Sequence, residues 1–352
     1  MTSTPTIIRQ AGGRVLAALL AAGCGDAGGA SATTGETTAA TTGDGDGSST
    51  LAPTTGESPT SGTATGGSTT GEEPGTGSTG STAAYTFTVT TGLAGPESCL
   101  WDPVSKYWYV SNLAAQTMDL TVADGVGWIS RLDAAGAIVD EQWVSGLDSP
   151  AGLRIAAGVL FVNDIQQVHE IDVASGAIVL THEFPDAVLL NDPAIDEATG
   201  IGYAADTFGN AIYQFKVGEL GGEAPLVVSP ALMGPNGLLF ADGRLYVASL
   251  IDFDPAHLGP FLQVDIASQA ITQIGATLGK FDGIEPWQGR FLLSDNQVGR
   301  LVAIDGEGAS EVLFDLQADH GFALAADHGV DPDAGVICVP NLMDSVGFVR
   351  TQ

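Results

Sequence analysis

From Tyr85 onward, the chain alternates apolar and polar residues in short runs separated by turns rich in Asp, Gly and Pro. Each run predicts a β-strand, because a period of two places the apolar side chains on one face of a sheet. The most regular runs are rich in aromatic and β-branched residues and occur six times: Tyr107–Asn112, Val159–Asp164, Ile201–Asp206, Arg244–Ser249, Arg290–Asp295 and Val336–Asn341.

Each of these runs belongs to a longer repeat. A short apolar strand precedes it, and a third strand follows it, joined in most copies by a fourth. The third strands are Ile129–Asp133, Val168–Asp172, Ile212–Phe215, Leu262–Asp265 and Leu301–Asp305. The period of about 40 to 55 residues is typical of a propeller blade. The sequence therefore predicts an all-β fold, a six-bladed β-propeller with four-stranded antiparallel blades, whereas the alternative of a β-sandwich predicts short strands without a long period.

The two ends of the repeat region complement each other. Val346–Arg350 supplies only a third strand to the last blade, while Tyr85–Thr90 precedes the first blade and has no partner there. A closed ring leaves no terminal edge exposed if both ends share a blade. Tyr85–Thr90 is therefore predicted to be the outermost strand of the sixth blade.

The N-terminal residues have a different character. Arg9 and Arg14 precede an apolar run that ends at Gly23-Cys24, the plan of a secretory signal peptide over residues 1–23. Small residues before Cys24 resemble a bacterial lipobox, so we expect a lipid anchor on Cys24; an ordinary signal peptide with an incidental Cys is the alternative. Residues 24–84, rich in Gly, Ser and Thr, predict a disordered tether before the propeller of residues 85–352. The expected location is the cell envelope, as an outer-membrane or cell-surface lipoprotein, or otherwise the secreted fraction.

Charge and cysteine content narrow the functional classes. With 11 Lys+Arg against 42 Asp+Glu, the net charge of −31 argues against nucleic acid as a partner. The expected partners are a small molecule and, through the anchor, a membrane, and we expect a monomer. Cys99 and Cys338 lie within apolar strand patterns, which predicts two buried thiols, with a disulfide as the alternative in an oxidising compartment.

Oxygen-bearing residues occupy the same place in four copies of the repeat, just before the short first strand. They are Glu97, Asn191, Asn236 and Asp282. Around a propeller axis they would converge on one point, and such oxygens favour Ca²⁺, with Mg²⁺, Mn²⁺ or Zn²⁺ as alternatives. The two carboxylates could also assist proton transfer to or from a bound water.

The remaining two copies lack such a residue. Their equivalent positions are predicted at Ala151 and in the region of His320 and Gly321.

At these positions the chain resembles the SMP-30/gluconolactonase/LRE family of six-bladed propellers and, more distantly, the paraoxonases. Four segments match that family's signatures in order, and the resemblance covers about Tyr85 to Gln352: Pro96-Glu97, Asn191-Asp192, Pro235-Asn236-Gly237-Leu238 and Asp282-Gly283-Ile284. The resemblance implies a metal ion bound by Glu97, Asn236 and Asp282, with Asn191 as a further ligand or substrate contact. It also implies lactone hydrolysis, in which the metal polarises the carbonyl and Asp282 acts as general base.

One departure from the family bears on the substrate. Sugar-lactone members tend to carry an Arg shortly before the Asn-Asp pair, whereas this chain has Val188, Leu189 and Leu190 there. We therefore expect an apolar lactone or ester, with Leu190 near the substrate and with Phe281, Met233 and Leu232 as further apolar surroundings. His320 is a candidate auxiliary base or substrate contact, with a purely structural role as the alternative.

Two functions remain open at this point. The first is an envelope-tethered, metal-dependent hydrolase of lactones or related esters, with Asp282 and Glu97 as catalytic residues. The second is a non-catalytic, metal-stabilised propeller that binds a small molecule or a protein. The sequence contains no phosphate-binding loop and no Gly-x-Ser-x-Gly elbow, so nucleotide binding and serine hydrolase chemistry have no support.

Overall fold

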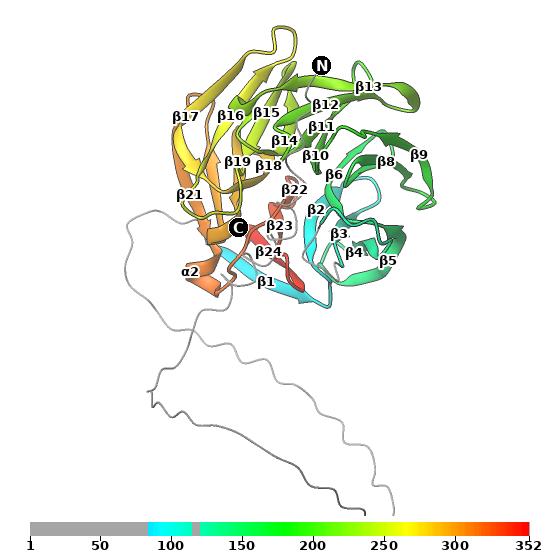
Figure 1. Ribbon diagram of the computed structural model, residues 1–352. Coiled ribbons are helices and arrows are strands. Elements are labelled where there is room, and N and C mark those ends of the chain that lie inside the picture. The colour runs from blue at the N-terminus through cyan, green and yellow to red at the C-terminus, as the bar shows by residue number, and fades with distance from the viewer. Residues whose placement is uncertain (1–83, 115–119, 352) are drawn as a thin grey trace, which may run out of the picture. The chain divides into compact units, whose positions relative to one another are not determined.

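The computed structural model describes residues 84–114 and 120–351. Within them, 24 strands form six four-stranded antiparallel sheets, which confirms the predicted six-bladed β-propeller (Figure 1). The predicted signal peptide, tether and lipidated Cys24 concern residues outside this part of the chain. Among the described residues, no helix is both long and apolar enough to cross a membrane.

The first three blades run outward from the axis in chain order. Blade 1 contains β2 (Pro96–Asp102), β3 (Tyr107–Asn112), β4 (Gly127–Leu132) and β5 (Ile138–Leu147). Blade 2 contains β6 (Pro150–Ala156), β7 (Val159–Asp164), β8 (Gln167–Asp172) and β9 (Ile178–Glu183). Blade 3 contains β10 (Leu190–Asp196), β11 (Ile201–Asp206), β12 (Ala211–Lys216) and β13 (Glu219–Val228).

Blades 4 and 5 follow the same plan, and blade 6 joins the two ends of the domain. Blade 4 contains β14 (Pro235–Ala241), β15 (Arg244–Ser249), β16 (Gly259–Asp265) and β17 (Ile271–Gly279). Blade 5 contains β18 (Phe281–Trp287), β19 (Arg290–Asp295), β20 (Arg300–Ile304) and β21 (Ser310–Asp315). Blade 6 contains β22 (Gly329–Asp331), β23 (Val336–Pro340), β24 (Ser345–Thr351) and β1 (Tyr85–Thr91). Short helical turns are η2 (Pro230–Leu232), η3 (Asn296–Val298) and α2 (Leu316–His320).

Apolar side chains between the blades form the core. Six hydrophobic clusters are present, and each one joins two neighbouring blades. Aromatic pairs contribute to these contacts: the ring centroids of Trp108 and Phe348 lie 5.7 Å apart, and those of Tyr246 and Phe291 lie 4.4 Å apart. Burial of apolar area thus favours closure of the ring, because an unclosed blade would expose one cluster to water.

Strand β1 closes the ring as predicted. It pairs antiparallel with β24 from Tyr85 opposite Thr351 to Thr91 opposite Ser345, one residue further than the sequence pattern indicated. Figure 1 shows β1 in cyan beside β24 in red. The innermost strands β2, β6, β10, β14, β18 and β22 then contact one another in cyclic order. Closure therefore brings the starts of the first strands around one axis.

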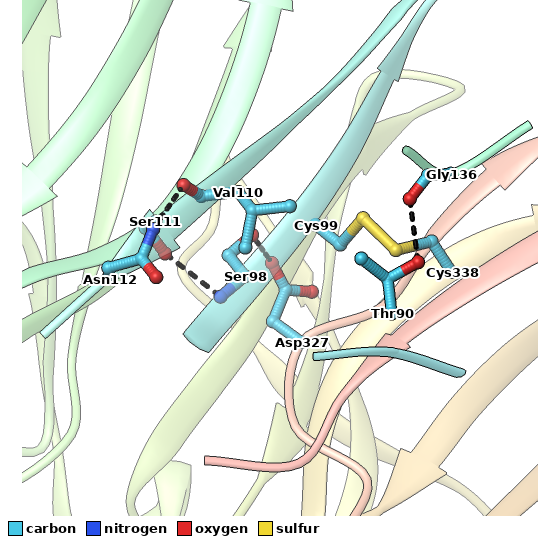
Figure 2. Close-up of a disulfide and its surroundings, with 9 residues drawn as sticks. All are labelled: Thr90, Ser98, Cys99, Val110, Ser111, Asn112, Gly136, Asp327 and Cys338. Carbon is cyan, nitrogen blue, oxygen red and sulfur yellow. Dashed lines mark hydrogen bonds between the residues drawn. A yellow bond between two sulfur atoms is a disulfide. The ribbon is translucent and has the colours of Figure 1, made fainter. Parts of the chain in front are cut away.

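A disulfide joins the first blade to the last. Cys99 on β2 and Cys338 on β23 form an S–S bond of 2.08 Å, with their Cα atoms 6.0 Å apart (Figure 2). The prediction of two free thiols was wrong, because residues 239 positions apart in the chain become neighbours only after the ring has closed. Gly329 permits this approach, since a Cβ at Gly329 would lie 2.1 Å from the Cys99 carbonyl oxygen.

We expect the Cys99→Ala/Cys338→Ala double variant to unfold more easily than the parent protein. The free energy of unfolding should fall by about 2 to 5 kcal/mol, because the covalent link restricts the unfolded chain over a long loop. Thermal melting under oxidising and reducing conditions would measure this. Equal melting temperatures for the parent protein with and without reductant would contradict the expectation.

Candidate functional site

A repeated irregularity at the start of each first strand shapes the site. In blades 1 to 5 the pairing register shifts between the first and the fourth residue of the strand, for example between Pro96 and Cys99 in blade 1 and between Phe281 and Ile284 in blade 5. Such a bulge leaves residues outside the regular ladder and re-aims their side chains. The second residue of the first strand is Glu97, Asn191, Asn236 or Asp282 in blades 1, 3, 4 and 5, and Ala151 in blade 2. We call the four oxygen-bearing residues the ring residues.

The four predicted oxygen residues line one pocket. The pocket also contains hydroxyl, amide and apolar side chains, and its volume is about 50 Å³. Its described lining consists of Glu97, Leu113, Leu120, Ser149, Ala151, Leu189, Asn191, Thr207, Phe208, Asn236, Leu250, Phe253, Asp282, Asn296 and Leu342. One water needs at least about 10 to 15 Å³ by a comparable measure, so there is space for an ion and a small group beside it.

Each of the four ring residues keeps one buried oxygen without a hydrogen-bond partner. These atoms are Glu97 Oε2, Asn191 Oδ1, Asn236 Oδ1 and Asp282 Oδ1. A buried unpaired polar atom is costly, and four of them at one pocket fit a hard divalent cation such as Ca²⁺. No group of three or more His, Cys, Asp or Glu side chains in the described part of the chain is placed to hold a metal, so the amide oxygens are essential to this fit.

Asn296 is a fifth polar residue of the pocket, and sequence reasoning missed it. Its Nδ2 donates a hydrogen bond to Asp282 Oδ2, and its own Oδ1 has no partner. The hydrogen bond fixes the Asp282 carboxylate so that Oδ1 remains free. Asn296 begins η3 after the second strand of its blade, a position outside the repeated motif, so the sequence offers no signal for it.

Acidic residues at the ends of the second strands hold the loops that lead into the ring. Asp206 accepts hydrogen bonds from the backbone N–H groups of Val188 and Leu189, at 2.9 and 3.0 Å, just before Asn191. Asp295 accepts one from Lys280 N at 2.9 Å, just before Asp282. The Asp residues that end the second strands therefore position the ring residues of the preceding strands.

The ring position of blade 6 is Ala326, which corrects the prediction of the His320 and Gly321 region. Gly329 pairs with Cys338 as Leu100 pairs with Tyr109 in blade 1, so Ala326 corresponds to Glu97 and Asp327 to Ser98. His320 instead ends α2, where its imidazole stacks on Phe87 at 4.5 Å and its Nε2 lies 3.1 Å from the Tyr85 hydroxyl. It is exposed and does not line the pocket.

The apolar residues expected near the substrate also differ from those observed. Leu190 is fully buried in the cluster between blades 2 and 3, and its neighbour Leu189 lines the pocket instead. Phe281 and Leu232 are fully buried in blade-blade clusters, and Met233 is 39% exposed away from the lining. A change of one residue reverses the side of a strand, which explains why the neighbours Leu189 and Asp282 line the pocket in place of Leu190 and Phe281.

Burial and mutual repulsion perturb the ring carboxylates. Desolvation, reinforced by the negative charges of Asp282 and Asp327, raises the pKa of Glu97 well above its ordinary value. Desolvation raises the pKa of Asp282 from 3.8 to about 7, although the hydrogen bond from Asn296 opposes this shift. The ring thus favours either protons or a bound cation at neutral pH.

A second tier of charged residues lies next to the ring and consists of Arg154, Glu285, Asp192 and Asp327. Arg154 on β6 and Glu285 on β18 form an ion pair of 2.6 Å, and their side chains are only 15% and 12% exposed. Blades 2 and 5 are opposite in a six-membered ring, so this pair spans the central channel. Asp192 and Asp327 lie within its electrostatic reach: Arg154 lowers the pKa of both, against larger opposing effects of burial.

Asp327 is held by a serine from the neighbouring blade. Ser98 donates a hydrogen bond from Oγ to Asp327 Oδ2, and Figure 2 shows the two side chains facing each other beside the disulfide. Desolvation raises the pKa of Asp327 to about 8. Its neighbour His328 is buried with both ring nitrogens unpartnered, and desolvation together with Arg154 lowers the pKa of His328 to about 3, so that imidazole is neutral.

Glycines at the third position of the first strands make room for these carboxylates. A Cβ at Gly152 would lie 2.2 Å from Asp192 Oδ1, and a Cβ at Gly283 would lie 2.3 Å from Asp327 Oδ1. Both contacts are too short for a side chain, so the polar second tier requires glycine in the adjacent blade.

Comparisons with known proteins support the fold. No known protein family's sequence profile matches the chain, and no curated protein has a similar sequence. Among solved structures, a gluconolactonase from Xanthomonas campestris is similar at 14% identity and a TM-score of 0.54, over 75% of this chain and 89% of that one.

Two further structures are similar to this chain. A catalytically inactive virginiamycin B lyase from Staphylococcus aureus, solved with quinupristin, matches at 13% identity and a TM-score of 0.51, over 76% of this chain and all of that one. A streptogramin B lyase matches at 10% identity and a TM-score of 0.51, over 76% and 98% of the two chains. At these identities the likeness extends to the propeller fold alone.

We expect the metal-free protein to lose stability as the pH rises from about 4 to about 8. Asp282 and Asp327 have raised pKa values in the folded state, so folding binds protons in this window and the stabilisation is lost as those carboxyls ionise. Thermal melting in chelator between pH 4 and pH 8 would measure this. The Asp282→Asn/Asp327→Asn variant is the control, and an equally steep pH dependence in that variant would contradict the assignment.

We also expect Ca²⁺ to stabilise the protein at pH 8. Binding at 100 times the dissociation constant corresponds to roughly 2.7 kcal/mol. Glu97→Gln and Asn236→Leu should each weaken Ca²⁺ affinity by about 10- to 100-fold or more, because each removes a direct oxygen ligand. Isothermal titration calorimetry would measure the affinity, and unchanged affinity in both variants would rule out the shared site.

Proposed function

We propose that the protein is a divalent-cation-dependent hydrolase of an apolar lactone or related ester. The observation that carries this proposal is the set of four unpartnered, buried oxygens from four blades at the base of a pocket with an apolar rim. The gluconolactonase among the similar structures is compatible with this reaction class. Export and a lipid anchor on Cys24 are part of the same proposal.

The residues that would hold the cation are Glu97, Asn191, Asn236 and Asp282. Ca²⁺ suits this oxygen set, with Mg²⁺, Mn²⁺ or Zn²⁺ as alternatives. When bound, the cation would act as a Lewis acid that polarises the substrate carbonyl.

Asp282 is the proposed general base. Its Oδ2 is held by Asn296, while Oδ1 offers one lone pair to the cation and a second to accept a proton from a water molecule as the water oxygen attacks the carbonyl carbon. The ester C–O bond then breaks, and the protonated Asp282 returns the proton to the leaving alkoxide oxygen. Glu97 supplies the second carboxylate of the site.

The pocket rim defines the expected substrate. Eight of the fifteen described lining residues are apolar, and none of the fifteen is Lys, Arg or His. The lining therefore offers no basic side chain to an anionic substrate, and its apolar residues outnumber its five hydroxyl and amide residues. An uncharged lactone or ester with a hydrocarbon substituent fits this composition.

The alternative is a non-catalytic propeller in which the cation stabilises the fold or helps to bind a ligand. The small volume of the pocket, about 50 Å³, favours this alternative, since a substrate must displace parts of the rim loops to enter fully. The two functions differ in turnover rather than in cation binding.

We expect the Ca²⁺-loaded protein to hydrolyse an alkyl-substituted γ-lactone faster than gluconolactone. The Asp282→Asn variant should lower kcat by about 10²- to 10⁴-fold, because it removes the proposed base and leaves the shape of the side chain intact. A pH-indicator assay over a panel of lactones and esters would measure this. Asp333→Asn, at an exposed turn of blade 6, is the matched control. Cation binding without turnover on any substrate would support the non-catalytic alternative.

A further inference from the structure

One long loop shapes the pocket rim. Residues 250–258 connect β15 to β16 with nine residues, whereas the corresponding loops of blades 3, 5 and 6 have four. The loop brings Leu250 and Phe253 into the pocket lining. Loops on a rigid scaffold commonly determine ligand specificity.

The backbone of this loop is held in a strained conformation. Ile251 adopts a left-handed φ of 65°, which is unfavourable for a β-branched residue. Such strain persists only where surrounding contacts impose it. Here Ile251 N donates to Met233 O at 3.0 Å, and Leu250 N donates to Gly234 O at 2.8 Å.

Lys280 clamps the loop from blade 5. Its ammonium lies 2.6 Å from Asp252 O, 3.3 Å from Asp252 Oδ1 and 3.5 Å from Leu250 O, and the side chain is only 2% exposed. A buried ammonium surrounded by these acceptors is strongly oriented. Because its donors are directed at the loop, Lys280 is unavailable to an anionic ligand.

A second residue of blade 5 supports the same loop. Gln297 donates from Nε2 to Phe253 O at 3.1 Å. Lys280 and Gln297 lie beside Asp282 and Asn296 in the chain, so the loop is tied to the strand and turn that carry two polar pocket residues. The position of Phe253 relative to the ring therefore depends on these contacts from blade 5 as well as on the backbone hydrogen bonds to Met233 and Gly234.

Phe253 faces a second aromatic residue across the pocket mouth. Its ring centroid lies 5.9 Å from that of Phe208, which is carried by the corresponding loop of blade 3. Both side chains are partly exposed and belong to the pocket lining. Two such rings offer flat apolar surface to a hydrocarbon group whose polar end lies at the ring oxygens.

We propose that Lys280 is a positioning residue that fixes loop 250–258, so that Phe253 and Phe208 select uncharged carbonyl compounds bearing an apolar substituent. This inference rests on the proposed function in two respects: the pocket is the binding site, and the carbonyl group of the ligand points toward the ring residues. It does not require turnover, because it concerns binding selectivity.

The test compares two non-hydrolysable ketones, cyclopentanone and 2-pentylcyclopentanone, by calorimetry with the full chain in CaCl₂. The parent protein should bind the pentyl ketone more tightly. Lys280→Met should weaken binding of the pentyl ketone by about tenfold, equivalent to losing the burial of about two CH₂ groups, and leave cyclopentanone affinity unchanged. Lys280→Arg should restore part of the selectivity, and Lys216→Met, which removes an exposed lysine, should have no effect.

Two further variants test the same inference if Lys280→Met does not fold. Phe253→Ala and Gln297→Ala should each lower the affinity for the pentyl ketone selectively. Equal losses for both ketones, no loss for either, or no preference in the parent protein would overturn the inference. Selective ketone binding without hydrolysis of any lactone would refute the proposed hydrolase and leave the role of Lys280 standing.

Discussion

Antiparallel pairing of β1 with β24 is the interaction on which the other features of this molecule depend. It joins the two ends of the domain in one blade, so every first strand gains two neighbours around the axis and every apolar cluster is shared by two blades. The disulfide between Cys99 and Cys338 reinforces the interface between the first and last blades. Without closure, the ring residues would be ordinary polar residues at strand starts, because each blade contributes at most one of them.

Closure concentrates negative charge in the channel. Glu97, Asp282, Asp192 and Asp327 are all buried, and desolvation raises the pKa of each. Repulsion by neighbouring carboxylates adds to this effect for Glu97, Asp192 and Asp327. Arg154, paired with Glu285 across the channel, partly compensates the charges of Asp192 and Asp327, although each of these two keeps one unpartnered oxygen, as the ring residues do. Like charges in a low-dielectric environment favour proton or cation uptake. The channel therefore couples the stability of the fold to occupancy of the ring.

The mouth of the pocket has a different origin from its base. The oxygens come from bulged strand starts that repeat in blades 1 to 5, whereas the apolar rim comes from loops that differ between blades in length and conformation. This division allows one scaffold to keep its polar base while the loops adapt to the ligand. In this chain the longest fully described rim loop is anchored by a buried lysine beside the ring, which links the two parts.

The sequence by itself determined the six-bladed architecture, the closure by Tyr85–Thr90 and the shared register of Glu97, Asn191, Asn236 and Asp282. These features follow from hydrophobic periodicity and from a repeat that the chain carries locally. Only the tertiary structure revealed Ala326 at the ring position of blade 6, the hydrogen bond from Asn296 to Asp282, the disulfide, and Phe208 and Phe253 at the rim. Each of these depends on contacts between distant segments or on a loop conformation such as that of Ile251, neither of which is encoded in a period along the chain.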